Sequence, residues 1–146
     1  MSSADPFLFD GACHCGGIAV ALAFTTDAAS TQVRACQCGF CTRQGAMTVS
    51  DPAGRARFAI VRDRLVKYEF ATRTATSLVC RVCGVYAGAM LSDGARTWSI
   101  ANVRGLAIAA FTGRTPEPSH YEHESAVERI SRRKLRWTPT EIVFQS

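Results

Sequence analysis

The sequence predicts a single domain that is mainly β, built of antiparallel strands with one helix near its C-terminal end. Three observations predict this fold class. Hydrophobic residues alternate with small residues over short segments, which is the period-two pattern of half-buried strands. Turn residues separate these segments, and one pattern near residue 120 has the spacing of a helix start. The 146 residues, 47% of them hydrophobic, suit one core.

The predicted strands follow one another from residue 18 onward. Ile18 to Phe24 carries apolar residues at every second position. Phe58 to Val61 and Leu65 to Phe70 are rich in β-favouring residues. The segments 86–91 and 96–100 flank Asp93-Gly94, which is a strong hairpin signal. Further short strands are predicted at Val33 to Cys36, Met47 to Val49, Ser77 to Cys80 and Ile142 to Phe144.

The single predicted helix begins at Ser119. Ser119 and Glu122 have the spacing of a capping box, and a partial apolar stripe follows them. No linker is long enough to divide the chain. We therefore expect one domain over residues 1–146, with a core of about 7–112 and a helical extension of about 116–146.

Charge and hydropathy narrow the functional class. No stretch approaches the ~18 consecutive apolar residues of a membrane span, and the first residues lack a secretory-signal pattern. We expect a cytoplasmic protein without a membrane partner. The net charge of +5 favours anionic partners. Much of the positive charge lies in one run of basic residues, which we interpret as a solvated helix face. We expect no nucleic-acid partner, because aromatic residues do not interleave with this run. This basic run comprises Arg129, Arg132, Arg133, Lys134 and Arg136.

Seven cysteines in three tight groups are the unusual feature of the sequence. In a reducing compartment, clustered thiols are metal ligands or catalytic groups rather than disulfides. The groups are Cys13 and Cys15; Cys36, Cys38 and Cys41; and Cys80 and Cys83.

The first and last groups predict a closed, structural zinc site. Structural zinc takes four ligands in a tetrahedron, delivered as close pairs from separate segments. Cys80 and Cys83 have the two-residue spacer of a zinc knuckle, and Gly84 permits its tight turn. Cys13 and Cys15 can share one face of an extended segment, because residues i and i+2 point the same way. Such a site would couple metal binding to folding.

The middle group predicts a different kind of site. Cys36, Cys38 and Cys41 supply three thiolates from six residues, and no cysteine remains as a fourth ligand. Three protein ligands with one exchangeable position are typical of catalytic zinc. Arg43 lies two residues on, where it can lower thiolate pKa values or attract an anionic substrate. The expected cofactor is therefore two Zn²⁺ per chain, one structural and one catalytic or labile.

The spacing also leaves alternatives open. The middle group could be a second structural site completed by His14, His120, His123 or an acidic side chain, or a redox-active thiol cluster without metal. The pairs could also be sorted differently between the sites. For function, the alternative is a non-catalytic, zinc-stabilised binding module for protein or nucleic acid that uses the basic run.

Four segments carry a resemblance to a known family. They read Gly11-Ala-Cys13-His-Cys15-Gly16, Cys36-Gln-Cys38-Gly-Phe-Cys41-Thr-Arg43-Gln-Gly45-Ala46, Cys80-Arg-Val-Cys83-Gly84-Val85 and Asn102-Val-Arg104-Gly-Leu106. They resemble the glutathione-dependent formaldehyde-activating enzyme family, also called the centromere protein V/GFA domain. The resemblance runs from about Gly11 to Phe111.

The resemblance implies a fold, a division of the cysteines and an activity. The fold would be an Mss4-like β-tent connected by zinc. The activity would be that of a carbon–sulfur lyase, joining formaldehyde and glutathione to S-hydroxymethylglutathione, so the expected partners are a small thiol such as glutathione and a small aldehyde. The implied structural ligands are Cys13, Cys15, Cys80 and Cys83, the implied catalytic ligands are Cys36, Cys38 and Cys41, and the candidate substrate-positioning residues are Arg43, Asn102 and Arg104.

Overall fold

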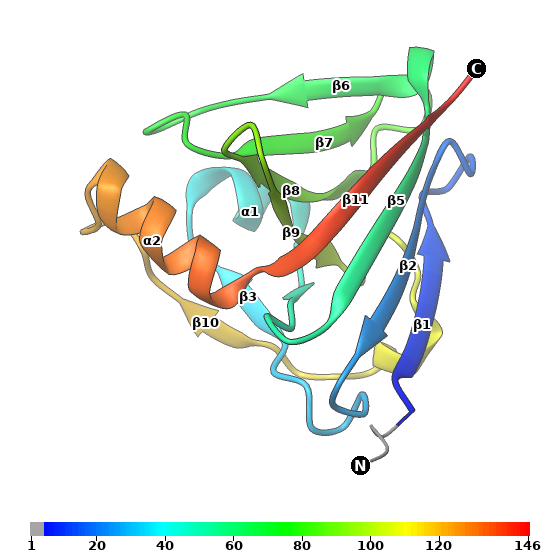
Figure 1. The fold of residues 1–146 in the computed structure, drawn as a ribbon, viewed down its shortest axis with the longest axis horizontal. Helices are drawn as coiled ribbons and strands as arrows, with labels where there is room; N and C mark the ends of the chain where they lie inside the picture. Colours follow the sequence, from blue (N-terminus) through cyan, green and yellow to red (C-terminus); the bar gives the residue numbers. More distant parts are fainter. Residues whose placement is uncertain (1–4) are drawn as a thin grey trace.

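The computed structural model describes residues 5–146 and is mainly β, which confirms the predicted fold class (Figure 1). Eleven strands form one branched sheet. The strands are β1 (Phe7–Ala12), β2 (Ile18–Phe24), β3 (Arg34–Cys36), β4 (Thr48–Val49), β5 (Arg55–Val61), β6 (Leu65–Tyr68), β7 (Thr76–Cys80), β8 (Tyr86–Ser92), β9 (Thr97–Asn102), β10 (Glu117–Ser119) and β11 (Thr138–Gln145). The helices are α1 (Gly39–Gln44) and α2 (Ala126–Arg136), with single 3-10 turns η1 (Arg62–Arg64) and η2 (Ala109–Phe111).

The two parts of the sheet meet at β11. Its first residues, Thr138 and Pro139, lie opposite Ser99 and Trp98 of β9, whereas the residues from Thr140 onward pair with β5. Strands β1 and β2 extend the sheet beyond β5. On the other side, the sheet branches at β9. One branch continues through β4 and β3 to β10, and the other continues through β8 and β7 to β6. One long strand therefore connects both parts.

Two strand pairs differ from the predicted antiparallel arrangement. β10 runs parallel to β3, and β11 runs parallel to β5. Parallel pairing needs a long crossover between the partners, and long chain segments separate the strands of both pairs. The segment predicted as a helical extension therefore contributes two strands to the sheet.

Helix α2 begins later than predicted. Ser125 is its N-cap: the Ser125 hydroxyl accepts from the Glu128 N–H, and the Glu128 carboxylate accepts from the Ser125 N–H. Ser119 instead lies in β10, opposite Cys36 of β3. The capping box at Ser119 and Glu122 was therefore wrong, because strand pairing holds Ser119 in an extended conformation.

The largest apolar core lies where the two parts of the sheet meet. It contains the buried, alternating residues of β2 and β5, as the pattern at Ile18 to Phe24 predicted. Its largest fully buried side chains include Phe24, Phe58 and Leu78. Burying each such side chain contributes about 1.5–3 kcal/mol. A separate small cluster of Cys41, Ala46 and Tyr86 packs at α1.

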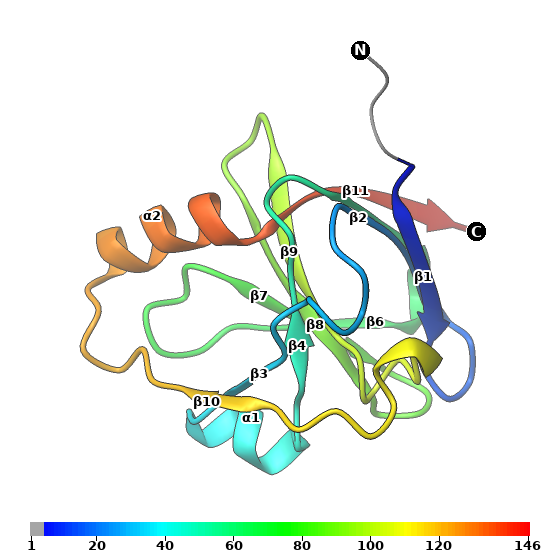
Figure 2. The same ribbon diagram turned by 90° about the horizontal axis from the view of Figure 1, so that it is seen from below.

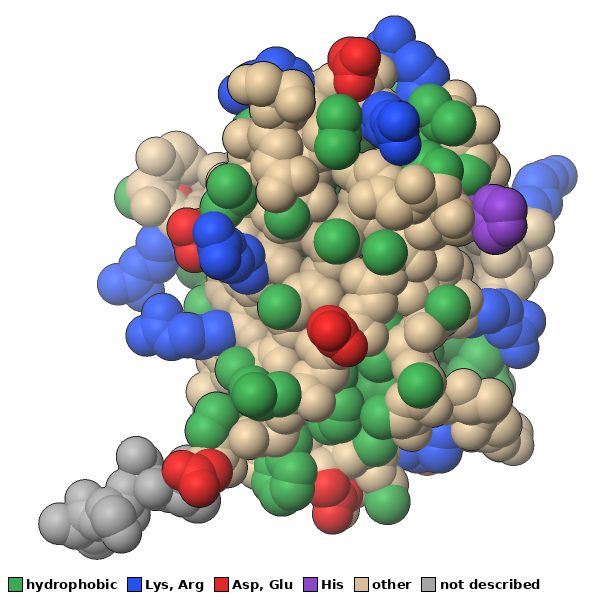
Figure 3. Space-filling view, turned by 90° about the vertical axis from the view of Figure 1, so that its right-hand side faces the viewer, with side chains coloured by type: hydrophobic (Ala, Val, Ile, Leu, Met, Phe, Trp, Pro, Cys, Tyr) green, Lys and Arg blue, Asp and Glu red, His purple; other side chains and the backbone are tan. Residues whose placement is uncertain are grey.

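The outer face formed by β1 and β2 is shown in Figure 3. Basic and acidic side chains are dispersed over it. In contrast, α2 lies on the opposite side of the molecule from β1 (Figures 1 and 2). Among residues 5–146, none of the helices has the length and hydrophobicity to cross a membrane.

Candidate metal centres and the adjoining cavity

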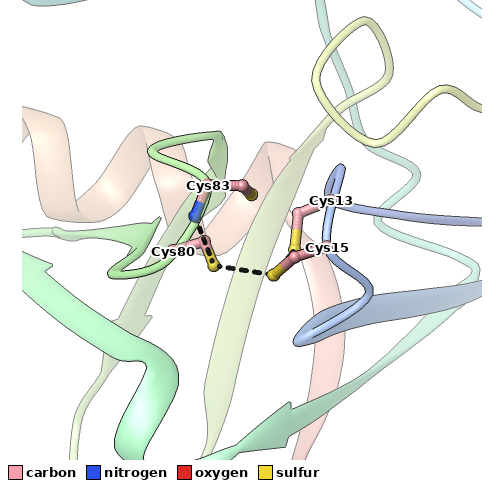
Figure 4. A group of neighbouring side chains, drawn as sticks. All are labelled: Cys13, Cys15, Cys80 and Cys83. Carbon is pink, nitrogen blue, oxygen red and sulfur yellow. Dashed lines mark hydrogen bonds between the residues drawn. The ribbon is translucent and has the colours of Figure 1, made fainter.

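Four cysteines from two distant turns converge on one point (Figure 4). Cys13 and Cys15 come from the turn between β1 and β2. Cys80 ends β7, and Cys83 lies in the turn to β8. Their four sulfur atoms all lie within 4.8 Å of one another, and we call them the four-cysteine cluster. The structure thus brings together the pairs that the spacing predicted.

The sulfur geometry of the four-cysteine cluster fits a tetrahedral metal site. A Zn–S bond of ~2.3 Å places tetrahedral sulfurs ~3.8 Å apart. The Sγ atoms of Cys13 and Cys15 are 3.8 Å apart, and those of Cys15 and Cys80 are 3.4 Å apart. All seven cysteines of the chain are free thiols. The cluster can therefore hold a metal ion.

Both turns of this cluster are built in the same way. The Gly16 N–H donates to the Cys13 carbonyl and the Gly84 N–H donates to the Cys80 carbonyl, each at 2.9 Å. Both glycines have positive φ, 82° and 78°, a conformation that other residues adopt only at a cost. Backbone N–H groups also point at sulfur, as from Ile18 to Cys13 at 3.2 Å. These turns aim the four sulfurs at one point.

The ionisation of these thiols is unequal. Burial raises the pKa of Cys13 to about 11. A backbone hydrogen bond from Gly17, helped by Cys80, lowers the pKa of Cys15. Burial opposes ionisation of Cys83, but backbone hydrogen bonds, that from Val85 first, lower its pKa to about 6. Neighbouring thiolates repel one another, so a bound cation would stabilise the fully ionised cluster.

The three-cysteine cluster is a local structure around α1. Cys36 ends β3, Cys38 is the N-cap of α1, and Cys41 lies in its first turn. The Cys38 sulfur accepts a hydrogen bond from the Cys41 N–H at 3.3 Å. The three sulfurs lie within 4.8 Å of one another. Because one short segment supplies all three, the site needs no distant partner to form.

Within the described residues 5–146, no fourth histidine, cysteine or acidic ligand atom joins this cluster. His120 is instead exposed, with its Nδ1 3.6 Å from Glu122 Oε1. Hydrogen bonds from Cys36 and Cys41 lower the pKa of Cys38 to about 2, whereas hydrogen bonds among the same three sulfurs raise the pKa values of Cys36 and Cys41. The cluster thus offers three ligand atoms.

All three of these cysteines line a cavity of about 810 Å³. One wall is aromatic, because Phe40 contacts the rings of Tyr68, Phe70 and Tyr86 at centroid distances of 5.4, 5.2 and 5.0 Å. The wall formed by α2 is basic. The four-cysteine cluster does not line this cavity. The two clusters therefore differ in both ligand number and access to a ligand.

The basic run of the sequence is largely part of this cavity. Arg129, Arg132 and Arg133 line it and are only partly exposed. Burial lowers the pKa of Arg133 to about 10, with Arg132 and Arg129 adding to the effect. The prediction of a solvated helix face was therefore wrong for these three residues. Lys134 and Arg136 are exposed, as predicted.

The three predicted substrate-positioning residues have different surroundings. Arg43 lines the cavity and its Nη1 donates to the Gly39 carbonyl at 2.9 Å. Asn102 is buried, with its Oδ1 accepting from the Met47 N–H and its Nδ2 donating to the Tyr86 carbonyl. Both ends of that amide hold the strands together. Arg104 is exposed and does not line the cavity.

The sequence reasoning missed several residues around the two clusters. Arg64 donates to the Cys15 sulfur at 3.6 Å and packs over Gly17. Ser119, Phe70 and Arg34 line the cavity. No local pattern identifies these residues, because strand pairing and helix packing bring them to the site from distant segments.

Comparison with known proteins gives a fold relative without a function. No family model matches the chain, and no curated protein matches it. A crystal structure of a Rhodobacter sphaeroides protein, a structural genomics target, is similar to it. The two are 29% identical, the match covers 77% of this chain and 99% of the other, and the TM-score is 0.52. The chain thus shares its fold with a protein whose description names no activity.

Proposed function

We propose that this protein is a zinc-dependent enzyme with carbon–sulfur lyase-like activity on the adduct of a small thiol and a small aldehyde. The thiol would be glutathione or a similar molecule, and the aldehyde would be formaldehyde or one of similar size. In this proposal the four-cysteine cluster holds a structural zinc and the three-cysteine cluster holds a catalytic zinc. The proposal also places the chain in the formaldehyde-activating family that its cysteine pattern resembles.

One observation carries the proposal: the cluster with the incomplete ligand set is the cluster that lines the cavity. A site that only stabilises a fold is normally closed by four protein ligands, as the four-cysteine cluster is. A site with three protein ligands beside a cavity leaves one position for a substrate atom.

The reaction would form one bond between sulfur and carbon. The thiol sulfur bonds to the carbonyl carbon, the carbonyl π bond opens onto oxygen, and the thiol proton ends on that oxygen to give a hydroxymethyl thioether. The lyase direction reverses each change. Zinc held by three thiolates supplies a Lewis-acid position that favours the ionised form of a bound thiol near neutral pH.

The residues of the chain would position the reactants. The rings of Phe40 and Tyr86 pack against the three-cysteine cluster and shield one side of it from water. Arg43 lies beside the cysteines, where its positive charge attracts an anionic thiol. Asn102 does not line the cavity; its side chain holds β9 to the start of β8, where Tyr86 lines the cavity.

Exchange NMR tests the activity directly. Zinc-loaded protein would be added to formaldehyde with glutathione, cysteine or 2-mercaptoethanol, and the exchange rate between free thiol and adduct compared with the spontaneous rate. We expect faster exchange with at least one thiol. Cys38→Ser should lose one metal ion per chain and the added rate together. No acceleration by protein that carries two zinc ions would overturn the proposal.

The alternative of a non-catalytic binding module has weaker support. It would use the basic run as an exposed surface, but Arg129, Arg132 and Arg133 face the cavity. Only Lys134 and Arg136 of that run are exposed. Two separated charges are a small surface for nucleic-acid phosphates.

A further inference from the structure

Four arginines concentrate positive charge along the lining of the cavity. Arg129, Arg132 and Arg133 stand at positions i, i+3 and i+4 of α2, so they share one face of the helix. Arg34 of β3 also lines the cavity. In Figure 2, α2 lies above the connection between β6 and β7, and β3 and α1, the segments that carry the three cysteines, lie below it.

Only one of these four guanidinium groups has a carboxylate partner. Arg132 Nε donates to both oxygens of Glu124, at 2.9 and 3.0 Å, and its guanidinium lies 3.6 Å from the Tyr121 ring centroid. Within residues 5–146, no carboxylate lies within 4.0 Å of Arg34, Arg129 or Arg133. Among residues 5–146, Glu122 is the one acidic residue that lines the cavity, and it is exposed and pairs with His120.

The remaining arginines bond to neutral oxygens only. Arg133 Nη1 donates to the Thr74 hydroxyl at 2.6 Å, and Arg129 Nη2 donates to the Tyr121 carbonyl at 3.1 Å. Arg34 Nη2 donates to the Ser50 hydroxyl at 2.6 Å. These bonds orient the side chains without neutralising them. Buried positive charge without a counterion is unfavourable, so an anion that binds beside these arginines gains attraction from them.

Among the described residues 5–146, three polar atoms of residues that line the cavity are buried without a hydrogen-bond partner. They are Arg129 Nε, Arg133 Nε and Ser119 Oγ. Buried donors are normally paired, and each unpaired one weakens the fold. Ser119 lies opposite Cys36 in the parallel pair of β10 and β3, so its hydroxyl is near the cysteine end of the cavity. All three atoms belong to residues that line the cavity, so the cavity has unused hydrogen-bonding capacity beside its arginines.

We infer that Arg129, Arg133 and Ser119 form an anion subsite, which binds the carboxylate or phosphate group of a small organic ligand. The aromatic wall of Phe40, Tyr68 and Phe70 would pack against the apolar body of that ligand. The assignment of this ligand as the substrate rests on the proposed function, whereas the anion subsite itself does not.

Calorimetric titration of the full, zinc-loaded chain tests the subsite with ligands that carry no thiol. The probes are 3-phenylpropionate, phenyl phosphate and, as the neutral control, 3-phenylpropionamide. We expect an anionic probe to bind at least ~10-fold more tightly than the amide, because charge-assisted hydrogen bonds are the strong ones. Whichever anion binds more tightly identifies the group as carboxylate or phosphate.

Matched variants locate the binding on α2. Arg133→Gln should weaken binding of the anionic probe by at least ~10-fold and change binding of the amide by no more than about twofold. Arg136→Gln removes the same charge from the same helix at an exposed position outside the cavity, and should change neither. Ser119→Ala removes one neutral hydroxyl and should weaken binding of the anionic probe by about three- to tenfold. Equal losses in Arg133→Gln and Arg136→Gln, or equal binding of amide and anion, would overturn the subsite.

Cys38→Ser separates this inference from the proposed function. This variant removes a ligand of the three-cysteine cluster but no residue of the anion subsite, so 3-phenylpropionate should still bind within about threefold of the unmodified chain. Anion binding without thiol exchange activity would leave the subsite standing and the enzyme proposal refuted. Thiol exchange activity that survives in a chain without anion binding would refute the subsite alone.

Discussion

At the scale of single residues, the glycines that follow the cysteine pairs set the metal geometry. Gly84 has a φ of 78° and open space where a Cβ would be placed. Gly84→Ala should therefore cost about 1–2 kcal/mol in free energy of unfolding, because an L-residue is strained at positive φ. It should also weaken zinc binding at the four-cysteine cluster, measured by competition with a chromophoric chelator.

Gly94 supplies the matched control. It lies in the β8–β9 turn, has a φ of 92°, and also has open space around its Cβ position. Gly94→Ala should show a similar loss of unfolding free energy in urea, but no change in zinc affinity. Equal zinc affinities in both variants would show that Gly84 does not shape the site.

Asp51 is a second residue with a measurable role. Its Oδ2 accepts from the Thr25 N–H and hydroxyl, at 2.6 and 2.7 Å. Burial opposes ionisation, but the hydrogen bonds prevail and lower the pKa of Asp51. Asp51→Asn should cost about 2 kcal/mol at pH 7, since hydrogen bonds to a charged group contribute about 1.5–3 kcal/mol.

The sign of the pH dependence follows from the lowered pKa of Asp51. The folded chain holds this proton less tightly than the unfolded chain, so its contribution is present above the ordinary carboxyl pKa of about 4 and is lost as pH falls through the folded value. The stability difference between the unmodified chain and Asp51→Asn should shrink below pH about 4 in urea titrations. A difference that stays constant down to pH about 3 would contradict this account.

At the scale of elements, α2 depends on its cap as well as on its packing. None of its residues is fully buried, and Val127 and Leu135 are exposed. Ser125→Ala removes the capping hydroxyl and should cost about 1 kcal/mol in unfolding free energy. Ser131→Ala, at an exposed position inside the same helix, should be neutral or slightly stabilising. Hydrogen exchange of the first α2 amides should increase in Ser125→Ala alone, and equal exchange in both would contradict the role of the cap.

The elements also show which features a local pattern can predict. The strand at Ile18 to Phe24 and the convergence of the cysteine pairs were confirmed, because alternation and ligand spacing are encoded within a few residues. The helix start was wrong because two segments have the capping-box spacing, and strand pairing at Ser119 leaves only the one at Ser125 available. The arginines of α2 were misjudged since their burial depends on distant segments.

At the scale of the whole molecule, the two cysteine clusters should contribute unequally to stability. The four-cysteine cluster joins residues that are 65 positions apart, whereas the three-cysteine cluster lies within one segment. A cross-link stabilises the fold by lowering the entropy of the unfolded chain. This contribution is about 4 kcal/mol for a loop of this length and about 2 kcal/mol for a loop of a few residues. Cys15→Ser should therefore lower the melting temperature more than Cys38→Ser does.

Metal analysis must accompany that comparison of melting temperatures. Each variant should retain one zinc ion per chain, at the cluster that was not changed. Removal of both ions with a chelator should destabilise the chain at least as much as Cys15→Ser does. A bound metal ion stabilises the folded state, and Cys15→Ser disables only one of the two sites. Equal melting temperatures for the two variants would show that the long connection adds no stability.

The position of β11 between β5 and β9 also has a consequence for biosynthesis. Both neighbours leave the ribosome well before Thr138, so during translation their facing edges have no partner. Unpaired edges invite association with other chains. The nascent protein must therefore pass through a stage in which all seven cysteines have been made but the strand that joins β5 to β9 has not.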